Sequence, residues 1–217
     1  MTITQIPSIS FGPYVTTNDV LNAVRTTIQT WSATYLAEMS RHDQQNPSIE
    51  FEVLPDFNSF PSALDLSEFV EEQMPSCIIV VPGVPSKPHR QGNGFYTAEL
   101  DVGIGVAVSG QDTETTRKLA SLYGAAVRQI ILQNSSLGGV TAGVVWTKEE
   151  YTGGFIRPTD QRTLAIGELE FTFTIDNFAN DSNGPLTPLS NANPPTGWPV
   201  VEFPSMTVTE SQPGQEP

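Results

Sequence analysis

The 217-residue chain has few of the side chains that catalysis and metal binding use. It contains one cysteine, Cys77, and two histidines, His42 and His89. One cysteine cannot form an intramolecular disulfide, and these three residues match no familiar zinc-ligand spacing. Cys77 lies in an apolar run, which favours a buried thiol over a reactive one. Because the G-x-S-x-G and P-loop motifs are also missing, we expect a protein that is not an enzyme and binds no cofactor or metal.

Positive charge is also scarce. Ten Lys and Arg residues stand against 24 Asp and Glu residues, and the net charge is -14. Because phosphate binding requires Lys and Arg to replace counterions, this balance argues against a surface that grips nucleic acid. It is compatible with a surface that DNA slides past. The sequence shows neither a signal-peptide pattern nor an apolar run of ~20 residues, so we expect a soluble, cytoplasmically made protein that does not enter membranes.

Two segments alternate between apolar and polar residues, as half-buried strands do. They extend from Tyr96 to Val108 and from Arg162 to Asp176. In each, the apolar residues share one parity and the carboxylates hold the other. The carboxylates that we single out are Glu99, Asp101, Glu168 and Glu170.

Two segments have helical periodicity. Asp112 is the predicted N-cap of a helix that ends at Gln133 and carries one apolar stripe. Another helix is predicted to begin after Thr16 or Thr17 and to end near Arg41. Its predicted apolar stripe consists of Val20, Val24, Ile28, Trp31, Tyr35 and Met39.

The remaining segments complete the predicted fold. Shorter strands are expected at 49–54, 77–81 and 140–151, and the strand at 77–81 is expected to be central because it is apolar on both faces. Residues 152–158 are predicted to be a connection. The fold class is α+β, a mixed, mostly antiparallel sheet of four to five strands with two main helices packed on one face. We expect a lead-in at 1–15, this domain at 16–179, and a Pro-rich, extended or disordered arm at 180–217.

The paired carboxylates are the first candidate site. Residues two apart on a strand project to the same side, so Glu99 with Asp101, and Glu168 with Glu170, could bind a cation or act as acid and base. The alternative is a solvated sheet face. Glu50 and Glu52 repeat the pattern on a third strand, which favours a broad acidic face.

Two further segments are candidates for contact with a neighbouring subunit. The Pro- and Gly-rich loop at 82–94 carries Lys87, His89 and Arg90, so it is either a solvated hairpin loop or a docking loop for an acidic neighbour, which could be another copy. Eight of the 18 prolines lie in the arm, which has no Lys or Arg. Trp198 and Phe203 are apolar anchors there, and they favour an arm docked on a neighbour over a solvated tail.

Six short segments, taken in order, carry a resemblance to a known family. They are Phe51-Glu52-Val53-Leu54-Pro55, Cys77-Ile78-Ile79-Val80-Val81-Pro82-Gly83, Gly103-Ile104-Gly105-Val106-Ala107-Val108-Ser109, Leu122-Tyr123-Gly124-Ala125-Ala126-Val127-Arg128, Ser136-Leu137-Gly138-Gly139 and Arg162-Thr163-Leu164-Ala165. Over about residues 16–178 the chain resembles the tail terminator, or tail completion, proteins of long-tailed bacteriophages. The arm lies outside the resemblance.

The resemblance implies a structural virion protein without enzymatic activity or cofactor. Family members form a ring, usually of six subunits, that caps the tail tube and joins it to the head–tail connector. DNA passes through such a ring without specific binding, so we hypothesise that Glu99, Asp101, Glu168 and Glu170 lie on or near its lumen. The alternatives are another neck ring (a connector or stopper), a tail tube protein and, from a different class, a small-molecule-binding α+β domain.

Overall fold

The computed structural model describes residues 15–44, 54–61, 73–84, 86–156 and 162–180. They form an α+β unit with two long helices and one five-stranded antiparallel sheet, which confirms the predicted fold class. The elements are α1 (Thr17–Gln44), β1 (Ser76–Gly83), β2 (His89–Arg90), β3 (Phe95–Gly110), α2 (Thr113–Gln133), the short 3-10 helix η2 (Leu137–Gly139), β4 (Gly143–Ile156) and β5 (Thr163–Asn180).

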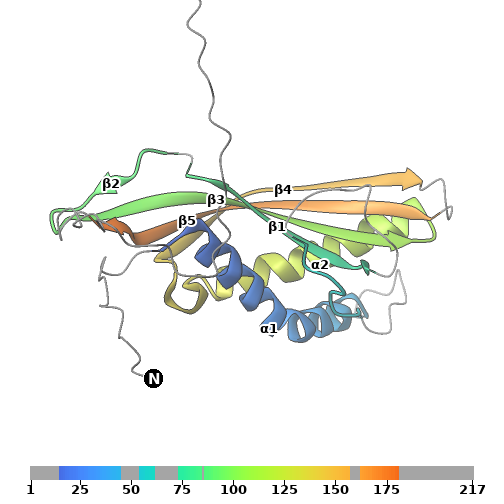
Figure 1. Cartoon of the computed structure of the whole chain (residues 1–217). Coiled ribbons are helices and arrows are strands. Elements are labelled where there is room, and N and C mark those ends of the chain that lie inside the picture. Colours follow the sequence, from blue (N-terminus) through green and yellow to red (C-terminus); the bar gives the residue numbers. More distant parts are fainter. Residues whose placement is uncertain (1–14, 45–53, 62–72, 85, 157–161, 181–217) are drawn as a thin grey trace, which may run out of the picture. The chain divides into compact units, whose positions relative to one another are not determined.

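The sheet is built around two long central strands. Its order is β1-β3-β5-β4, and β2 pairs with β3. Strand β5 occupies one side of β3 along nearly its whole length, from Phe95 opposite Asn180 to Gly110 opposite Thr163. Strands β1 and β2 therefore share the other side of β3. Figure 1 shows the long strands lying side by side.

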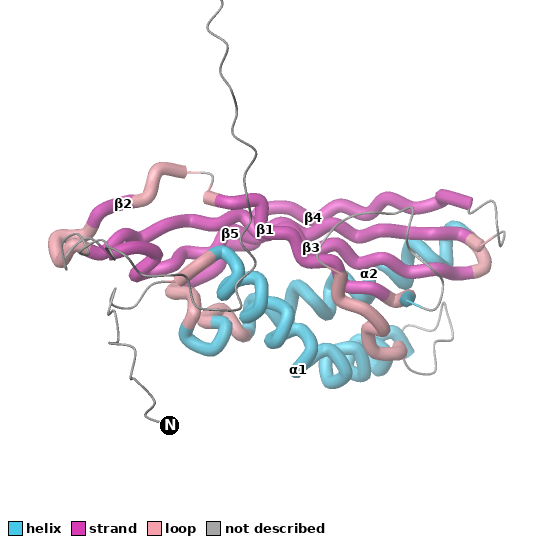
Figure 2. Tube along the Cα trace, in the orientation of Figure 1, coloured by secondary structure: helices cyan, strands magenta, loops and turns pink. Residues whose placement is uncertain are grey.

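Both helices cover the same face of the sheet (Figures 1 and 2). The core lies between these helices and the sheet. On the sheet side it consists of the alternate apolar residues of β3 and β5 that the sequence predicted to be buried, and those named next are fully or almost fully buried. These buried strand residues are Leu100, Val102, Ile104, Val106, Val108, Leu169, Phe171, Phe173 and Ile175. Burial of apolar surface contributes about 25 cal/mol per Å², so this layer stabilises the packing of the helices on the sheet.

Side-chain caps fix where the helices begin. The Asp112 carboxylate accepts a hydrogen bond from the backbone N–H of Thr115 at 2.8 Å, as predicted for the N-cap of α2. Before α1, the backbone N–H and hydroxyl of Thr16 donate to Asp19 at 2.8 and 2.6 Å, and the N–H of Asp19 donates back to the Thr16 hydroxyl. This reciprocal arrangement is a capping box.

The predicted apolar stripe of α1 was wrong at Trp31, while Tyr35 and Met39 are half-buried and pack against the core. Trp31 is 42% exposed, whereas Ser32, Leu36 and Ser40 are buried, so the buried face advances in steps of four. Of the two buried serines, Ser40 has backbone partners for its hydroxyl, whereas the buried Ser32 hydroxyl has no hydrogen-bond partner among the described residues. The Ser40 hydroxyl donates to the Leu36 carbonyl at 2.9 Å and accepts from the Leu54 N–H at 2.8 Å.

Strand β1 is a terminal strand, so its predicted central place was wrong. Both of its faces are covered, since Cys77 and Ile79 pack in the main core and Ile78 packs on the other face in a second apolar cluster with Met74, Ala107, Leu164 and Ile166. Residues 59–61 run along its outer edge and accept backbone hydrogen bonds from Cys77 and Ile79. Two other predictions also differ. Pro82 and Gly83 belong to β1 and His89–Arg90 form β2, which shortens the predicted loop, and β4 continues through 152–156, which was predicted to be a connection.

Several predictions concern parts of the chain that the structure does not describe. Apart from Val15, Leu54 and Asn180, the lead-in at 1–15, the strand at 49–54 and the arm at 180–217 lie outside the described residues. The two arm anchors, Trp198 and Phe203, lie there as well.

Candidate functional site

The four predicted carboxylates lie on one face of the sheet, the face turned away from the helices. Glu99 and Asp101 stand opposite Thr174 and Thr172, while Gly103 and Gly105 stand opposite Glu170 and Glu168. These positions have the parity opposite to the buried residues of β3 and β5. Directly opposed residues of an antiparallel pair project to the same face, so the four carboxylates share it.

Their arrangement is a stripe rather than a cluster. Along β3 and β5 they occupy four successive rows in the order Glu99, Asp101, Glu170, Glu168. Because successive same-face residues of a strand lie about 7 Å apart, the stripe extends over about 20 Å. Among the described residues no group of three or more His, Cys, Asp or Glu side chains could hold a metal ion. The acidic stripe, as we call these four residues, therefore fits the broad acidic face better than a chelating site.

Two more carboxylates extend the acidic stripe, and sequence reasoning did not single them out. Glu150 of β4 stands opposite Glu168 on the same face. At the other end, Asp176 accepts a hydrogen bond from the Thr97 hydroxyl at 3.0 Å, much as Asp101 accepts one from Thr172 at 2.7 Å. These hydroxyls orient the carboxylates without neutralising them.

One cation lies within the acidic face. Lys148 is the one Lys or Arg in the four long strands, and its ammonium is 3.0 Å from Glu150 and 3.7 Å from Glu170. The hydrogen bond with Glu150, followed by the attraction of Glu150, Glu170 and Glu168, raises the pKa of Lys148. Lys148 therefore remains charged, but six carboxylates against one lysine leave the face negative.

The other side of β4 carries a polar network that the sequence did not suggest. The Arg128 guanidinium of α2 lies 2.6 Å from the Glu149 carboxylate and 4.9 Å from the centre of the Trp146 ring. The Tyr151 hydroxyl donates to Glu149 at 2.5 Å. Burial, reinforced by Glu149, raises the pKa of Tyr151, so the phenol stays protonated. The network ties the terminal strand to α2.

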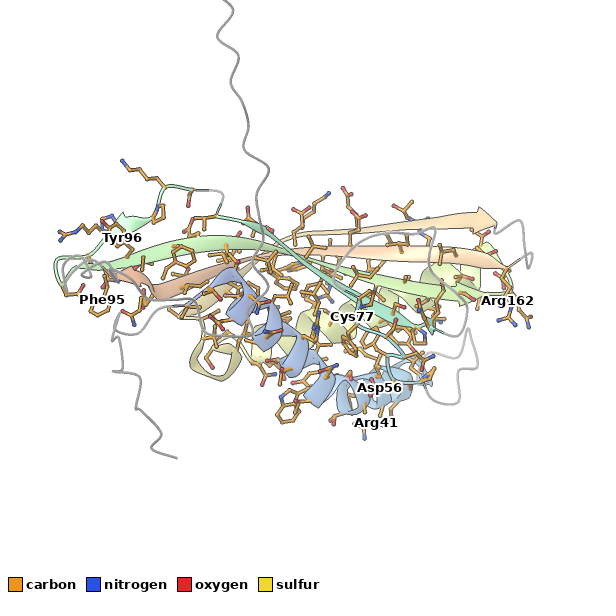
Figure 3. The ribbon with its side chains drawn as sticks, in the orientation of Figure 1. Arg41, Asp56, Cys77, Phe95, Tyr96 and Arg162 are labelled. Carbon is orange, nitrogen blue, oxygen red and sulfur yellow. The ribbon has the colours of Figure 1, made fainter. Side chains whose placement is uncertain are left out.

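Three of the predicted docking residues lie in or beside the short strand β2. Lys87, His89 and Arg90 are all exposed, and His89 and Arg90 stand opposite Thr97 and Tyr96 of β3. Figure 3 shows Tyr96 at the end of the sheet remote from Arg162. His89 shares the face of Thr97, one row beyond Glu99, so the basic residues lie beside one end of the acidic stripe.

The described residues offer little for nucleophilic chemistry. Cys77 is fully buried between the sheet and the helices (Figure 3), and this burial raises the pKa of its thiol. A hollow of about 660 Å³ beside α1 and η2, lined partly by Thr26, Trp31 and Leu137, is open to solvent rather than enclosed. No helix in the described ranges is long and apolar enough to cross a membrane.

Comparison with known proteins adds no relative. The chain matches no protein-family model, and a search of curated proteins finds no similar sequence.

Proposed function

We propose that the protein is a tail terminator of a long-tailed bacteriophage. About six copies would form a ring that ends the tail tube and joins it to the head–tail connector or stopper. It is assembled in the host cytoplasm, becomes part of the virion, and acts without catalysis or cofactor. The observation that carries the proposal is the acidic stripe on a sheet face that the helices leave uncovered.

An acidic face suits a channel through which DNA must pass. Two unit charges about 10 Å apart in water repel by only about 0.4 kcal/mol, and physiological salt weakens this further. One carboxylate therefore has little effect on a phosphate. A stripe repeated around a ring acts along the whole channel, and it prevents the counterion-releasing contacts that would make DNA adhere.

Native mass spectrometry and electron microscopy of the purified protein, alone and with purified tail tubes, test the assembly. We expect a closed ring that is found once, at one end of each tube. A long stack of rings would instead indicate a tube protein, and a ring that joins heads but not tubes would indicate another neck protein. A protein that stays monomeric and does not bind tubes would refute the proposal.

The lumen hypothesis has its own test. Glu168→Gln with Glu170→Gln removes two charges per copy from the acidic stripe, and Glu38→Gln with Glu114→Gln removes two from the helices. At low salt we expect the first variant to retain severalfold more DNA in co-sedimentation, and the second to behave as the parent does. Equal retention by both variants would mean that net charge alone matters, and the lumen assignment would fail.

A further inference from the structure

Strand β4 forms an open edge of the sheet. From Gly143 to Gly153 every residue is exposed or half-buried. In the described part of the chain, the backbone ladder of β4 joins it only to β5. An open edge carries a row of N–H and C=O groups that can pair with another strand, and proteins normally cover or interrupt such edges.

The other terminal strand of the sheet, β1, has a covered edge. Ser76 to Ile79 of β1 are buried. Along its outer side, the N–H groups of Cys77 and Ile79 donate to the carbonyls of Ser59 and Pro61 at 3.0 and 3.3 Å. Within the described ranges, the chain therefore covers one edge with its own backbone and leaves the other open over a longer stretch.

Exposed apolar side chains gather at the open edge. Four large hydrophobic side chains are exposed in the described residues, and two of them are consecutive on β4, with Val145 on the acidic face opposite Thr172 and Trp146 on the helix face opposite Phe171. A third, Leu132, lies one helical turn after Arg128, whose guanidinium covers the Trp146 ring. Apolar side chains gathered along an unpaired strand are typical of a surface that another chain covers.

The open edge is held in place before any partner arrives. Arg128 and Tyr151 both engage Glu149, so a helix on one side and a neighbouring tyrosine fix the middle of β4. A strand that is already ordered loses little conformational entropy when it pairs.

The charges at the two edges of the sheet are opposite. Around β4, four carboxylates outnumber two cations. They are Glu149, Glu150, Glu168 and Glu170, against Arg128 and Lys148. Across the sheet, on the side of β3 away from β5, the basic hairpin (residues 86–94) exposes Lys87, His89 and Arg90. The two edges of this sheet do not pair with each other in the described chain, but they can meet between two copies.

We propose that the open edge of β4 receives the basic hairpin of a second copy, so that the sheets continue from subunit to subunit. The contact is heterologous, since two different edges meet, and contacts of this kind form a ring when the rotation from copy to copy closes and an open filament when it does not. The inference rests on the proposed function, because it names the surfaces through which that ring would form.

Cysteine cross-linking tests the contact, because the single native thiol, Cys77, is buried and does not react. His89→Cys labels the hairpin and leaves Lys87 and Arg90 in place, while Thr152→Cys labels β4 and leaves its carboxylates in place. With a flexible bis-maleimide, the full chain carrying both substitutions should give a ladder that ends at the closed ring. Either substitution alone should give no ladder, and a mixture of the two single variants should give dimers.

A second pair of variants tests the apolar part of the edge. Trp146 and Trp31 are both 42% exposed, so truncating either one removes a similar exposed ring. Trp146→Ala should weaken assembly at least about tenfold, as expected for an interface aromatic, whereas Trp31→Ala should leave assembly unchanged. Thermal unfolding of both variants confirms that each one is folded.

The outcomes separate this inference from the proposed function. Rings seen by native mass spectrometry that give no ladder would overturn the contact and leave the terminator proposal standing. Dimers from Thr152→Cys alone would mean that two β4 edges pair about a two-fold axis, which overturns the head-to-tail contact. Monomers at all concentrations, with or without tail tubes, would overturn both.

Discussion

Gly124 is where the structure predicts the sharpest effect of a single methyl group. It lies in the interior of α2, where glycine costs about 1 kcal/mol relative to alanine. The Tyr151 side chain explains the glycine. A Cβ on Gly124 would lie 2.2 Å from the Tyr151 hydroxyl oxygen, and a Cβ on Gly167 of β5 would lie 2.7 Å from the same ring. The tyrosine therefore lies in a slot between two glycines and cannot move aside freely.

Gly124→Ala should stabilise the helix through its propensity and destabilise the fold through its clash with Tyr151. The alanine gains about 1 kcal/mol of helix propensity. Against this, overpacking costs about 1–3 kcal/mol, and displacing the Tyr151 hydroxyl from the Glu149 carboxylate costs about 1.5–3 kcal/mol more. We expect a net loss of about 1.5–5 kcal/mol in the free energy of unfolding, and each kcal/mol lowers Tm by about 2–4 °C in a domain of this size.

Urea unfolding of four proteins measures the effect and its cause. They are the parent, Gly124→Ala, Tyr151→Ala and the double variant. In the Tyr151→Ala background the clash is absent, so Gly124→Ala should become stabilising by about 1 kcal/mol. If Gly124→Ala changes stability by the same amount and in the same direction in both backgrounds, the slot does not explain the glycine.

Three further predictions follow from the helices and the polar network. Arg128→Met leaves the largely buried Glu149 carboxylate without its cation and should cost about 2–4 kcal/mol in urea unfolding, and Glu149→Gln in the same chain should recover part of this loss. Leu36→Ala should cost about 2–5 kcal/mol and Trp31→Ala under about 1 kcal/mol, and equal costs would contradict the observed buried face of α1. The hydrogen bond from the helix backbone lowers the pKa of Asp112 below its ordinary 3.8, so its contribution is present above that value and is lost as pH falls through the folded-state pKa. Thermal unfolding between pH 7 and roughly pH 2 should therefore show a smaller acid-induced loss of Tm in Asp112→Ala than in the parent.

The sequence predicted best those features that depend on neighbouring residues alone. Alternation along β3 and β5 placed Glu99, Asp101, Glu168 and Glu170 on one face, because parity is a local property of an extended chain. The N-cap at Asp112 was predicted for the same reason, since it needs only the first turn of α2.

Features set by distant parts of the chain were predicted less well. Apolar residues on both faces of β1 suggested a central strand, but its outer edge pairs with residues 59–61, and Ile78 packs on the face away from the helices with Ala107, Leu164 and Ile166, which are distant in the sequence. Two glycines near the end of β4 suggested a connection, yet Gly153 fits within the strand, where the pairing with β5 is irregular. The network of Arg128, Glu149 and Tyr151 joins a helix to a strand and leaves no local pattern to recognise.

The two proposals constrain each other through the shape of the sheet. If β4 of each copy pairs with the basic hairpin of the next, the joined sheets must curve into a closed ring. Both helices lie on one face of the sheet, and a helix layer is about 10 Å thick. If the helices lie outside the sheet, their layer has a radius about 10 Å larger than the sheet layer and a circumference about 60 Å longer. In a ring of six, each copy's helices then have about 10 Å more room than its strands. Inside the ring the same helices would have to be crowded together by a similar amount. Edge-to-edge closure therefore favours helices outside and the acidic stripe inside, so a cross-linked ladder would also support the lumen assignment.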